Sequence, residues 1–440
     1  MQRLQQLERH IRGTKSKKDE VTEKNPDDVV IVAAYRTAIT RAGKGKFKNL
    51  NSDELLMKLV SAVLLKVKVD PKWIEDVSVG NVLNPGAGVN EHRAAIIAAG
   101  VPAEAPFIAL NRQCSSGLMA VNDIANKIIT GQIDCGLAAG VESMSNNYGP
   151  QAAPHISDSV KNASNDAKNC MLPMGTTSEN VNSQYGLTRL EQDQFAASSY
   201  QKAERAVRLG LFRDEILPIT IEDQDEDDGE EYEEEDDEQG RQNQQNSNNH
   251  NKSKPSVHRQ IVVKDDEGPR PNVTAKSLSR LKPAFKKDGT SHAGNSSQIS
   301  DGAAAVILMR RDMAMKSELP ILAKYVATAI VGVPPSIMGV GPAYAIPKLL
   351  KKVELSKDDV QVYEINEAFA GQALFSINKV GIPIGKVNPR GGAIALGHPL
   401  GCTGARQICT LIRELAPGQI GVTSMCIGGG QGAAGMFVRE

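Results

Sequence analysis

The amino-acid sequence predicts an α/β fold. From Asp28 onward, short apolar runs that favour strands alternate with stretches of helical periodicity, which is the order of a sheet covered by helices. The strand-like runs are apolar on both faces, which indicates a sheet buried between helix layers. A chain of 440 residues exceeds one ordinary domain, so we expect two or three domains.

The elements of the first part follow one another at short intervals. Strands are predicted from short apolar runs, and helices from apolar residues that recur every three or four positions. In chain order these elements are the strand Val29 to Ala34, the helix Asp53 to Val67, the strand Val77 to Val82, and the helices Arg93 to Ala99 and Gln113 to Ile129.

The later part of the chain repeats this order. Ile74 to Val79 corresponds to Lys357 to Val362 at an offset of 283, and Gly131 to Ile133 corresponds to Gly418 to Ile420 at 287. Coincidence between short motifs is the alternative, and the nearly equal offsets make it the weaker one. The sequence therefore predicts two copies of one α/β unit.

Two reactive side chains occupy equivalent positions in the two copies, because His398 follows Cys114 by 284 residues, which is close to the offset of the repeat. Two copies of one unit place these residues at comparable sheet ends, where open α/β sheets bind ligands. His398 lies in the glycine-rich turn Gly391 to Pro399, and Cys426 lies in a second such turn, Ser424 to Gly430. Clustered glycines indicate backbone held close to a ligand, although two tight turns with incidental polar residues are an alternative.

Composition excludes several classes of protein. The longest apolar runs fall far short of the roughly 20 residues that span a bilayer, so no membrane span is expected. The few aromatic residues and the lack of a zinc-finger or RNA-recognition signature give nucleic-acid binding no support. Six cysteines without a CxxC pair or a preceding secretory segment favour reduced thiols in an intracellular compartment.

The net charge of -1 conceals an acidic segment. Glu222 to Glu238 carries 14 acidic residues, and without them the chain has 51 basic and 38 acidic residues. A basic body is compatible with a phosphate-bearing substrate, although solvated surface lysines explain it as well. The whole stretch Glu222 to Pro255, with its Asn/Gln tract Gln242 to Asn251, is predicted to be a disordered surface insertion rather than a functional acidic arm.

Cys114 has the setting of a nucleophile. It lies at the N-terminus of the helix predicted up to Ile129, with Ser115 and Ser116 as candidate caps. A helix N-terminus lowers a thiol pKa from about 8.5 toward roughly 3.5 to 7.5, so we expect a thiolate here. A buried small hydrophobe is the alternative for a single cysteine. His398 would serve as its base and Cys426 as a proton shuttle. Two thiols could also carry out disulfide exchange, but that reaction usually uses a CxxC pair, which this sequence lacks.

Asn366 follows the apolar strand-like run Val360 to Tyr363. At a strand end it could hold a water molecule or donate a hydrogen bond to an oxyanion, which typically contributes roughly 3 to 4 kcal/mol to transition-state stabilisation. An N-cap for a helix from Glu367 onward is an equally good interpretation of the sequence alone.

Together these motifs resemble the thiolase family, specifically the peroxisomal type of 3-ketoacyl-CoA thiolase. The resemblance spans about Asp28 to Val438 and rests on the NEAFA motif at Asn366, the GGAIALGHPLG motif around His398 and the Cys-x-Gly turn at Cys426. It implies duplicated α/β halves in a layered αβαβα arrangement with an inserted loop domain. The implied division is a flexible targeting tail (1–27), an N-terminal half (28–144 plus 300–317), a loop domain (145–299, with the insertion 222–255) and a C-terminal half (318–440).

The resemblance also implies roles for five site residues. Cys114 would be the acyl-accepting nucleophile, His398 would activate it, and Cys426 would be the acid/base thiol. Asn366, through a bound water, and His398 would form one oxyanion hole. The backbone N–H groups of Cys114 and Gly428 would form the other.

The intermediate region resembles the loop domain that covers CoA in this family. Ser297, Arg270 and Phe285 would contact CoA, and the pocket wall would include Met174, Met338 and Phe369. Pro173 stands where short-chain biosynthetic thiolases usually carry His, which favours a broader, degradative substrate range. The resemblance implies no metal and no bound cofactor, because CoA is a substrate. It also implies a homodimer.

The tail resembles an amino-terminal peroxisomal targeting signal in its pattern Arg3-Leu4-x5-His10-Ile11, which implies a peroxisomal location and an import receptor as partner. As a physical pattern it is a short amphipathic helix that presents Leu4, Leu7 and Ile11 on one face to a receptor groove.

The sequence thus predicts thiolytic cleavage of 3-ketoacyl-CoA to acetyl-CoA and a shortened acyl-CoA. Two alternatives stay open: an acetoacetyl-CoA thiolase that works in the condensation direction, and a catalytically silent acyl-CoA-binding or assembly protein. A nicotinamide-dependent Rossmann enzyme is weaker, because no GxGxxG follows an early strand.

Overall fold

The computed structural model describes residues 16–149, 155–223 and 259–440. The predicted targeting motif from Arg3 to Ile11 and most of the predicted insertion, residues 224–255, lie outside the described residues. No helix in the described ranges is long and apolar enough to cross a membrane.

The first repeat is an α/β unit whose last strand comes from much later in the chain. Its elements are β1 (Val29–Arg36), β2 (Thr40–Arg41), α3 (Ser52–Val67), β3 (Asp76–Gly80), α4 (Val89–Ala98), β4 (Phe107–Leu110), α5 (Ser116–Ile129), β5 (Cys135–Ser143) and β8 (Ser300–Arg310). All five predicted elements are present. Helix α4 begins four residues before its predicted start, directly after Gly88 at a left-handed φ of 66°. Helix α5 begins three residues after its predicted start, because Gln113 at φ 48° belongs to a turn.

The second repeat follows the same order, except that the short helix α15 stands where the first has β4. Its elements are β9 (Ala323–Gly332), α13 (Gly341–Lys352), β10 (Val362–Ile365), α14 (Ala370–Val380), α15 (Ala393–Leu396), α16 (Thr403–Glu414), β11 (Ile420–Ile427) and β12 (Gln431–Arg439). In the first unit, β3 and β5 are parallel and β8 runs antiparallel to both β5 and β1. In the second unit, β10 and β11 are parallel and β12 runs antiparallel to both β11 and β9. The predicted internal repeat is therefore confirmed.

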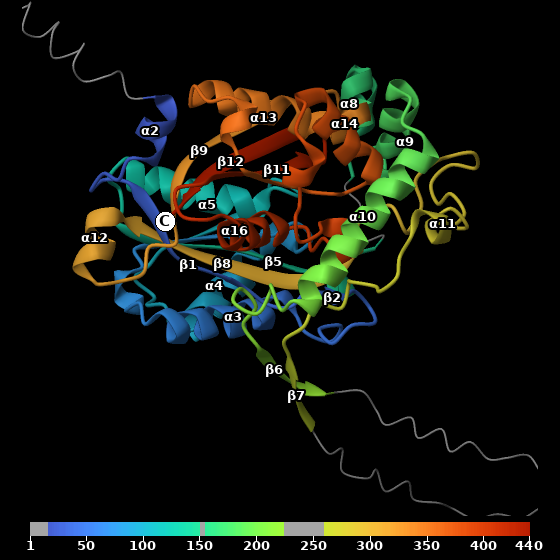
Figure 1. The fold of residues 1–440 in the computed structure, drawn as a ribbon. Coiled ribbons are helices and arrows are strands. Elements are labelled where there is room, and N and C mark those ends of the chain that lie inside the picture. The colour runs from blue at the N-terminus through green and yellow to red at the C-terminus, as the bar shows by residue number, and fades with distance from the viewer. Residues whose placement is uncertain (1–15, 150–154, 224–258) are drawn as a thin grey trace, which may run out of the picture.

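The two units meet through their first strands, β1 and β9, where Val30 pairs with Lys324 and Ile31 with Ala323. The strand order is β10-β11-β12-β9-β1-β8-β5-β3-β4. Figure 1 shows α5 and α16 side by side between the two halves of this sheet. Their apolar residues form one core with inward-facing residues of both halves, for example Leu118, Ile408, Val306 and Met425.

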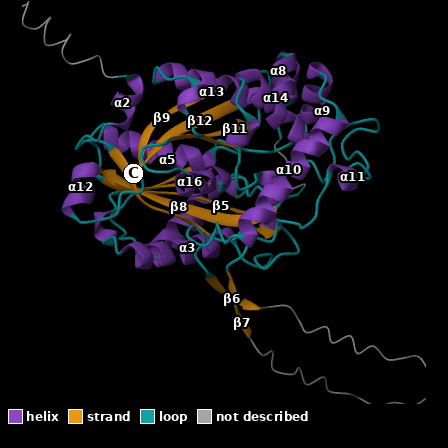
Figure 2. Cartoon of the chain, viewed as in Figure 1, coloured by secondary structure: helices purple, strands orange, loops and turns teal. Residues whose placement is uncertain are grey.

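Further helices cover the two outer faces. Helices α3 and α4 lie beyond β5 and β8, and α13 and α14 lie beyond β9 and β12 (Figure 1). Figure 2 shows the strands in orange between purple helices on both sides. The predicted order αβαβα is thus observed. Strands β5 and β11 are buried along their whole length, as expected for strands between two helix layers.

The connection between β5 and β8 forms a separate group of helices beside the layers. It contains α6 (Met144–Asn147), α7 (Asp158–Ala163), α8 (Asn165–Asn169), α9 (Met174–Tyr185), α10 (Arg189–Arg208) and α11 (Ala275–Leu278). The hairpin of β6 (Ile219–Asp223) and β7 (Arg259–Val263) projects from the body (Figure 1). Outside these groups lie α2 (Lys17–Thr22) and α12 (Arg311–Lys316).

Candidate active site

Cys114 lies in the turn that joins β4 to α5. The Ser116 hydroxyl donates to the Gln113 carbonyl at 2.7 Å and accepts from the Arg112 N–H at 2.9 Å. The Ser115 hydroxyl donates to the Arg112 carbonyl at 2.9 Å. Ser115 is the N-cap residue of α5, as predicted, but its side chain makes no capping hydrogen bond, and Ser116 is already the first residue of the helix. Both hydroxyls instead close the turn that presents Cys114.

The Cys114 thiol is buried, with 3% of the residue exposed. Burial raises its pKa to about 12, although the sulfur accepts hydrogen bonds from its own backbone N–H and from that of Gly428. The predicted low pKa is therefore wrong for the free protein, because removing the thiol from water outweighs the nearby N–H groups. A free thiolate is therefore unfavourable here, which favours transfer of the proton to a base as the sulfur reacts.

Cys426 lies next to Cys114. It is fully buried in β11, and burial raises the pKa of its thiol, with a smaller contribution from Cys114. Its apolar neighbours are Met338, Ala368 and Phe369, with Met174 packed against them. The structure thus brings the three predicted wall residues together around the second thiol.

His398 is held at both ring nitrogens. Its Nδ1 atom lies 2.6 Å from the Thr403 hydroxyl, and its Nε2 atom lies 3.3 Å from the Asn366 side-chain nitrogen. Burial, with a smaller contribution from the positive charge of Arg406, lowers the pKa of His398 to about 3. The imidazole is consequently neutral at physiological pH and able to accept a proton.

Asn366 directly follows β10, which ends at Ile365. Its backbone N–H donates to the Ser424 carbonyl at 2.8 Å. Helix α14 begins only at Ala370, so the alternative of an N-cap is wrong. The Asn366 Oδ1 atom is buried and has no hydrogen-bond partner among the described residues. This amide therefore has one buried group available for a further hydrogen bond.

Two of the three predicted CoA contacts, Ser297 and Phe285, adjoin the NEAFA turn. The Ser297 N–H donates to the Ala368 carbonyl at 2.9 Å, which joins its loop to the NEAFA turn. The Phe285 ring is 46% exposed and meets the Phe369 ring edge to face, with centroids 5.7 Å apart. Arg270 is exposed. Phe285 thus lies between the buried Phe369 and solvent.

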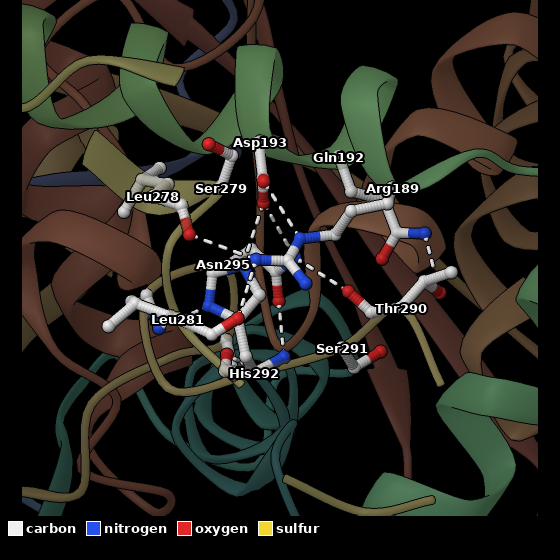
Figure 3. A network of polar contacts seen from close by, with 12 residues as sticks. Arg189, Gln192, Asp193, Leu278, Ser279, Leu281, Thr290, Ser291, His292 and Asn295 are labelled. Carbon is white, nitrogen blue, oxygen red and sulfur yellow. Dashed lines mark hydrogen bonds and ion pairs between the residues drawn. The ribbon is translucent and has the colours of Figure 1, made fainter. Parts of the chain in front are cut away.

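A buried polar network holds the loop that carries Ser297 (Figure 3). The Asp193 carboxylate on α10 accepts from His292 Nε2 at 2.7 Å, from Asn295 Nδ2 at 3.2 Å and from Arg189 Nε at 2.8 Å. His292 Nδ1 accepts from a backbone N–H two residues along the chain. Both ring nitrogens of His292 are therefore committed to fixing the shape of the loop.

Comparison with known proteins decides the family. The thiolase N-terminal domain matches residues 29–312, and the thiolase C-terminal domain matches residues 319–439. The chain belongs to the thiolase family. It is 54% identical over 445 residues to the peroxisomal 3-ketoacyl-CoA thiolase of Yarrowia lipolytica, with all of both chains covered. It is 46% identical to the peroxisomal 3-ketoacyl-CoA thiolase of Homo sapiens, with 99% of each chain covered.

Solved structures agree. The dimeric peroxisomal thiolase of Saccharomyces cerevisiae superposes with a TM-score of 0.85 and 52% identity, over 96% of this thiolase and 100% of that chain. A second structure of the yeast 3-ketoacyl-CoA thiolase, described as five-layered and built from two core domains of identical topology, gives a TM-score of 0.75 at 48% identity, over 95% and 99% of the two chains.

One site residue of this thiolase escaped the sequence analysis. Glu142 is a buried carboxylate in β5 that accepts from the backbone N–H groups of Val82, Leu83 and Gly401 and from the Asn81 side chain at 2.9 to 3.1 Å. Burial raises its pKa to about 7. The sequence feature that points to Glu142 is a charged side chain within a strand that is otherwise mostly apolar. It fixes the turn after His398 to the end of the first sheet.

No group of three or more His, Cys, Asp or Glu side chains in residues 16–149, 155–223 and 259–440 is placed to hold a metal ion.

Proposed function

We propose that this thiolase cleaves 3-ketoacyl-CoA with CoA, giving acetyl-CoA and an acyl-CoA two carbons shorter, as a step of peroxisomal fatty-acid β-oxidation. One observation carries the catalytic part of the proposal. Cys114, His398 and Asn366 come from three loops of the two repeats and Cys426 from the end of β11. All four are buried, with Cys426 beside Cys114 and His398 beside Asn366.

The first half-reaction breaks a carbon–carbon bond. His398 Nε2 takes the proton from Cys114 while the sulfur attacks the 3-keto carbon, because the raised pKa of the thiol makes a free thiolate costly. The resulting oxyanion lies against the N–H groups of Cys114 and Gly428, which already face the sulfur. Collapse of this intermediate forms the acyl thioester and expels acetyl-CoA as its enolate.

The enolate needs both charge stabilisation and a proton. Asn366, through a water on its free Oδ1 atom, and His398 would stabilise the enolate oxygen. The Cys426 thiol would donate its proton to the enolate carbon. The Cys426 thiolate would then take the proton of incoming CoA, whose sulfur attacks the acyl thioester and regenerates Cys114.

The surroundings of the site support a substrate that extends beyond an acetyl group. Met174, Met338 and Phe369 line the side of Cys426 with flexible or flat apolar groups. We infer that Ser297, Arg270 and Phe285 contact CoA. CoA enters as a substrate, and no metal or bound cofactor takes part in the steps above.

The test is CoA-dependent cleavage of acetoacetyl-CoA and of a long-chain 3-ketoacyl-CoA by the purified protein. We expect cleavage of both substrates and its loss in Cys114→Ala. Cleavage of acetoacetyl-CoA alone would support the alternative of a short-chain thiolase that works in condensation. Binding of both substrates by the wild-type protein without cleavage of either would overturn the catalytic proposal in favour of a silent binding protein.

We further infer a homodimer, from the similarity to the dimeric yeast enzyme, and import through a receptor that recognises the tail. Light scattering at micromolar concentration tests the dimer, which predicts twice the 47.2 kDa chain mass. A reporter fused to residues 1–30, with and without substitution of Arg3 and His10, tests import. A diffuse cytosolic signal from the intact tail would contradict it. The division into halves 28–144 plus 300–317 and 318–440, a loop domain 145–299 and a tail 1–27 is likewise an inference.

A further inference from the structure

The environment of Thr403 determines which nitrogen of His398 carries the proton. Thr403 is the first residue of α16, and its hydroxyl is buried. The Thr403 Oγ1 atom lies 2.6 Å from His398 Nδ1 and 2.9 Å from the Pro399 carbonyl oxygen. Both distances are those of hydrogen bonds, so each needs one proton.

A hydroxyl group has one proton to donate. The Pro399 carbonyl has none, so the proton between Thr403 and Pro399 must come from Thr403. The proton between Thr403 and His398 must then come from His398 Nδ1. The other ring nitrogen, Nε2, is left with its lone pair, and the Asn366 side-chain nitrogen at 3.3 Å is placed to donate to it.

We propose that Thr403 is a positioning residue that holds His398 in the Nδ1–H tautomer, so that Nε2 is the basic nitrogen. This inference rests on the proposed function, in which Nε2 takes the proton of Cys114. The three side chains then form a nucleophile, a base and a group that orients the base. A carboxylate that oriented the base would add a negative charge to the buried site, whereas the Thr403 hydroxyl adds none.

The same contact matters most after proton transfer. Once Nε2 is protonated, the ring is positively charged and its Nδ1–H bond to Thr403 becomes charge-assisted. Thr403 therefore stabilises the reacting state more than the resting state, and such a difference appears in kcat rather than in KM. The position of Thr403 at the start of α16, anchored by its own N–H to the Pro399 carbonyl at 3.0 Å, fixes the hydroxyl in place.

Two substitutions separate the hydroxyl from the shape of the side chain. Thr403→Val keeps the shape and removes the acceptor, whereas Thr403→Ser keeps the acceptor. We expect kcat for thiolysis to fall about 10- to 100-fold in Thr403→Val, the range for losing a hydrogen bond to a charged group, with KM changed less than about threefold. Thr403→Ser should stay within about threefold of wild type. Equal kcat in wild type and Thr403→Val would overturn the proposal without touching the proposed function.

A spectroscopic measurement on the wild-type protein tests the tautomer without any assay of activity. Nitrogen-15 NMR of protein labelled at histidine separates protonated from unprotonated ring nitrogens, and His398→Asn identifies the signals. We expect a protonated Nδ1 and an unprotonated Nε2 at pH 7. The opposite tautomer would overturn the proposal, even if Thr403→Val failed to fold.

Discussion

Gly117 at the start of α5 lies directly against Gly401, which precedes α16. A Cβ atom on Gly117 would stand 2.7 Å from the Gly401 carbonyl oxygen and 2.8 Å from the Ala405 nitrogen. These two helix starts carry the Cys114 turn and the His398 turn. Their contact through bare backbone therefore sets the distance between the proposed nucleophile and its base.

Substituting Gly117 by Ala should push these two turns apart. We expect kcat to fall by at least about tenfold, and the free energy of unfolding to fall by about 1 to 3 kcal/mol, the usual cost of overpacking. Gly385→Ala is the matched control, because a Cβ atom there meets nothing within 4 Å. Steady-state kinetics and guanidinium unfolding of both variants check the prediction. A Gly117→Ala variant with wild-type kcat would show that this contact does not determine the distance between Cys114 and His398.

His398 should make the protein sensitive to acid. Its pKa is about 3 in the folded protein and about 6.5 in an unfolded chain. Below pH 6.5 the unfolded chain therefore binds more protons than the folded protein. The stabilisation from keeping His398 neutral is complete above pH 6.5 and is lost as the pH falls toward 3.

The size of this effect can be measured against His398→Asn. Between pH 7 and pH 5 the wild-type protein should lose about 2 kcal/mol more of its free energy of unfolding than the variant. Guanidinium unfolding at both pH values gives the difference. If the two proteins lost the same amount, the imidazole would not be buried and neutral.

Arg406 and Glu364 form a buried ion pair, with Arg406 Nη1 3.1 Å from Glu364 Oε2, and the Arg406 charge reaches His398. Removing one partner leaves the other charge buried without compensation. Arg406→Met should therefore lower the free energy of unfolding by about 3 to 5 kcal/mol. The double variant with Glu364→Gln should be more stable than Arg406→Met alone. A double-mutant cycle by guanidinium unfolding checks this, and additive losses would contradict it.

Asp193 should support CoA binding without taking part in the chemistry. Asp193→Asn replaces one carboxylate oxygen by a donor in the network of Figure 3, which weakens the hold on the loop before Ser297. We expect KM for CoA to rise about 3- to 10-fold and kcat to stay within about threefold. Asp288→Asn on the exposed surface is the control. A fall in kcat with unchanged KM would place Asp193 in a different role.

The repeat and the layers could be predicted because they follow from apolar periodicity. Both copies keep the same strand and helix spacing, and burial on two faces leaves the strands continuously apolar. The helix starts were less accurate, because the left-handed backbone at Gly88 and Gln113 depends on the turns around them. Such turns are set by contacts that the local sequence does not contain.

The electrostatics of the site could not be predicted from the sequence. A cysteine before a helix suggests a low pKa, yet the burial of Cys114 depends on β11 and the turn at Gly428, more than 300 residues away. The sequence does not indicate the role of Thr403 either, although this residue follows His398 by only five positions. Its role requires the hydroxyl at the start of α16 to point back at the imidazole.

The most direct test of the central claim is to find the acyl group on the enzyme. The protein is mixed with a long-chain 3-ketoacyl-CoA in the absence of CoA and quenched in acid, and its peptides are analysed by mass spectrometry. Acyl transfer through Cys114 predicts an acyl group two carbons shorter than that of the substrate on the Cys114 peptide, with Cys426 unmodified. An acyl group on Cys426, or cleavage with no acyl-enzyme at any time, would contradict the account.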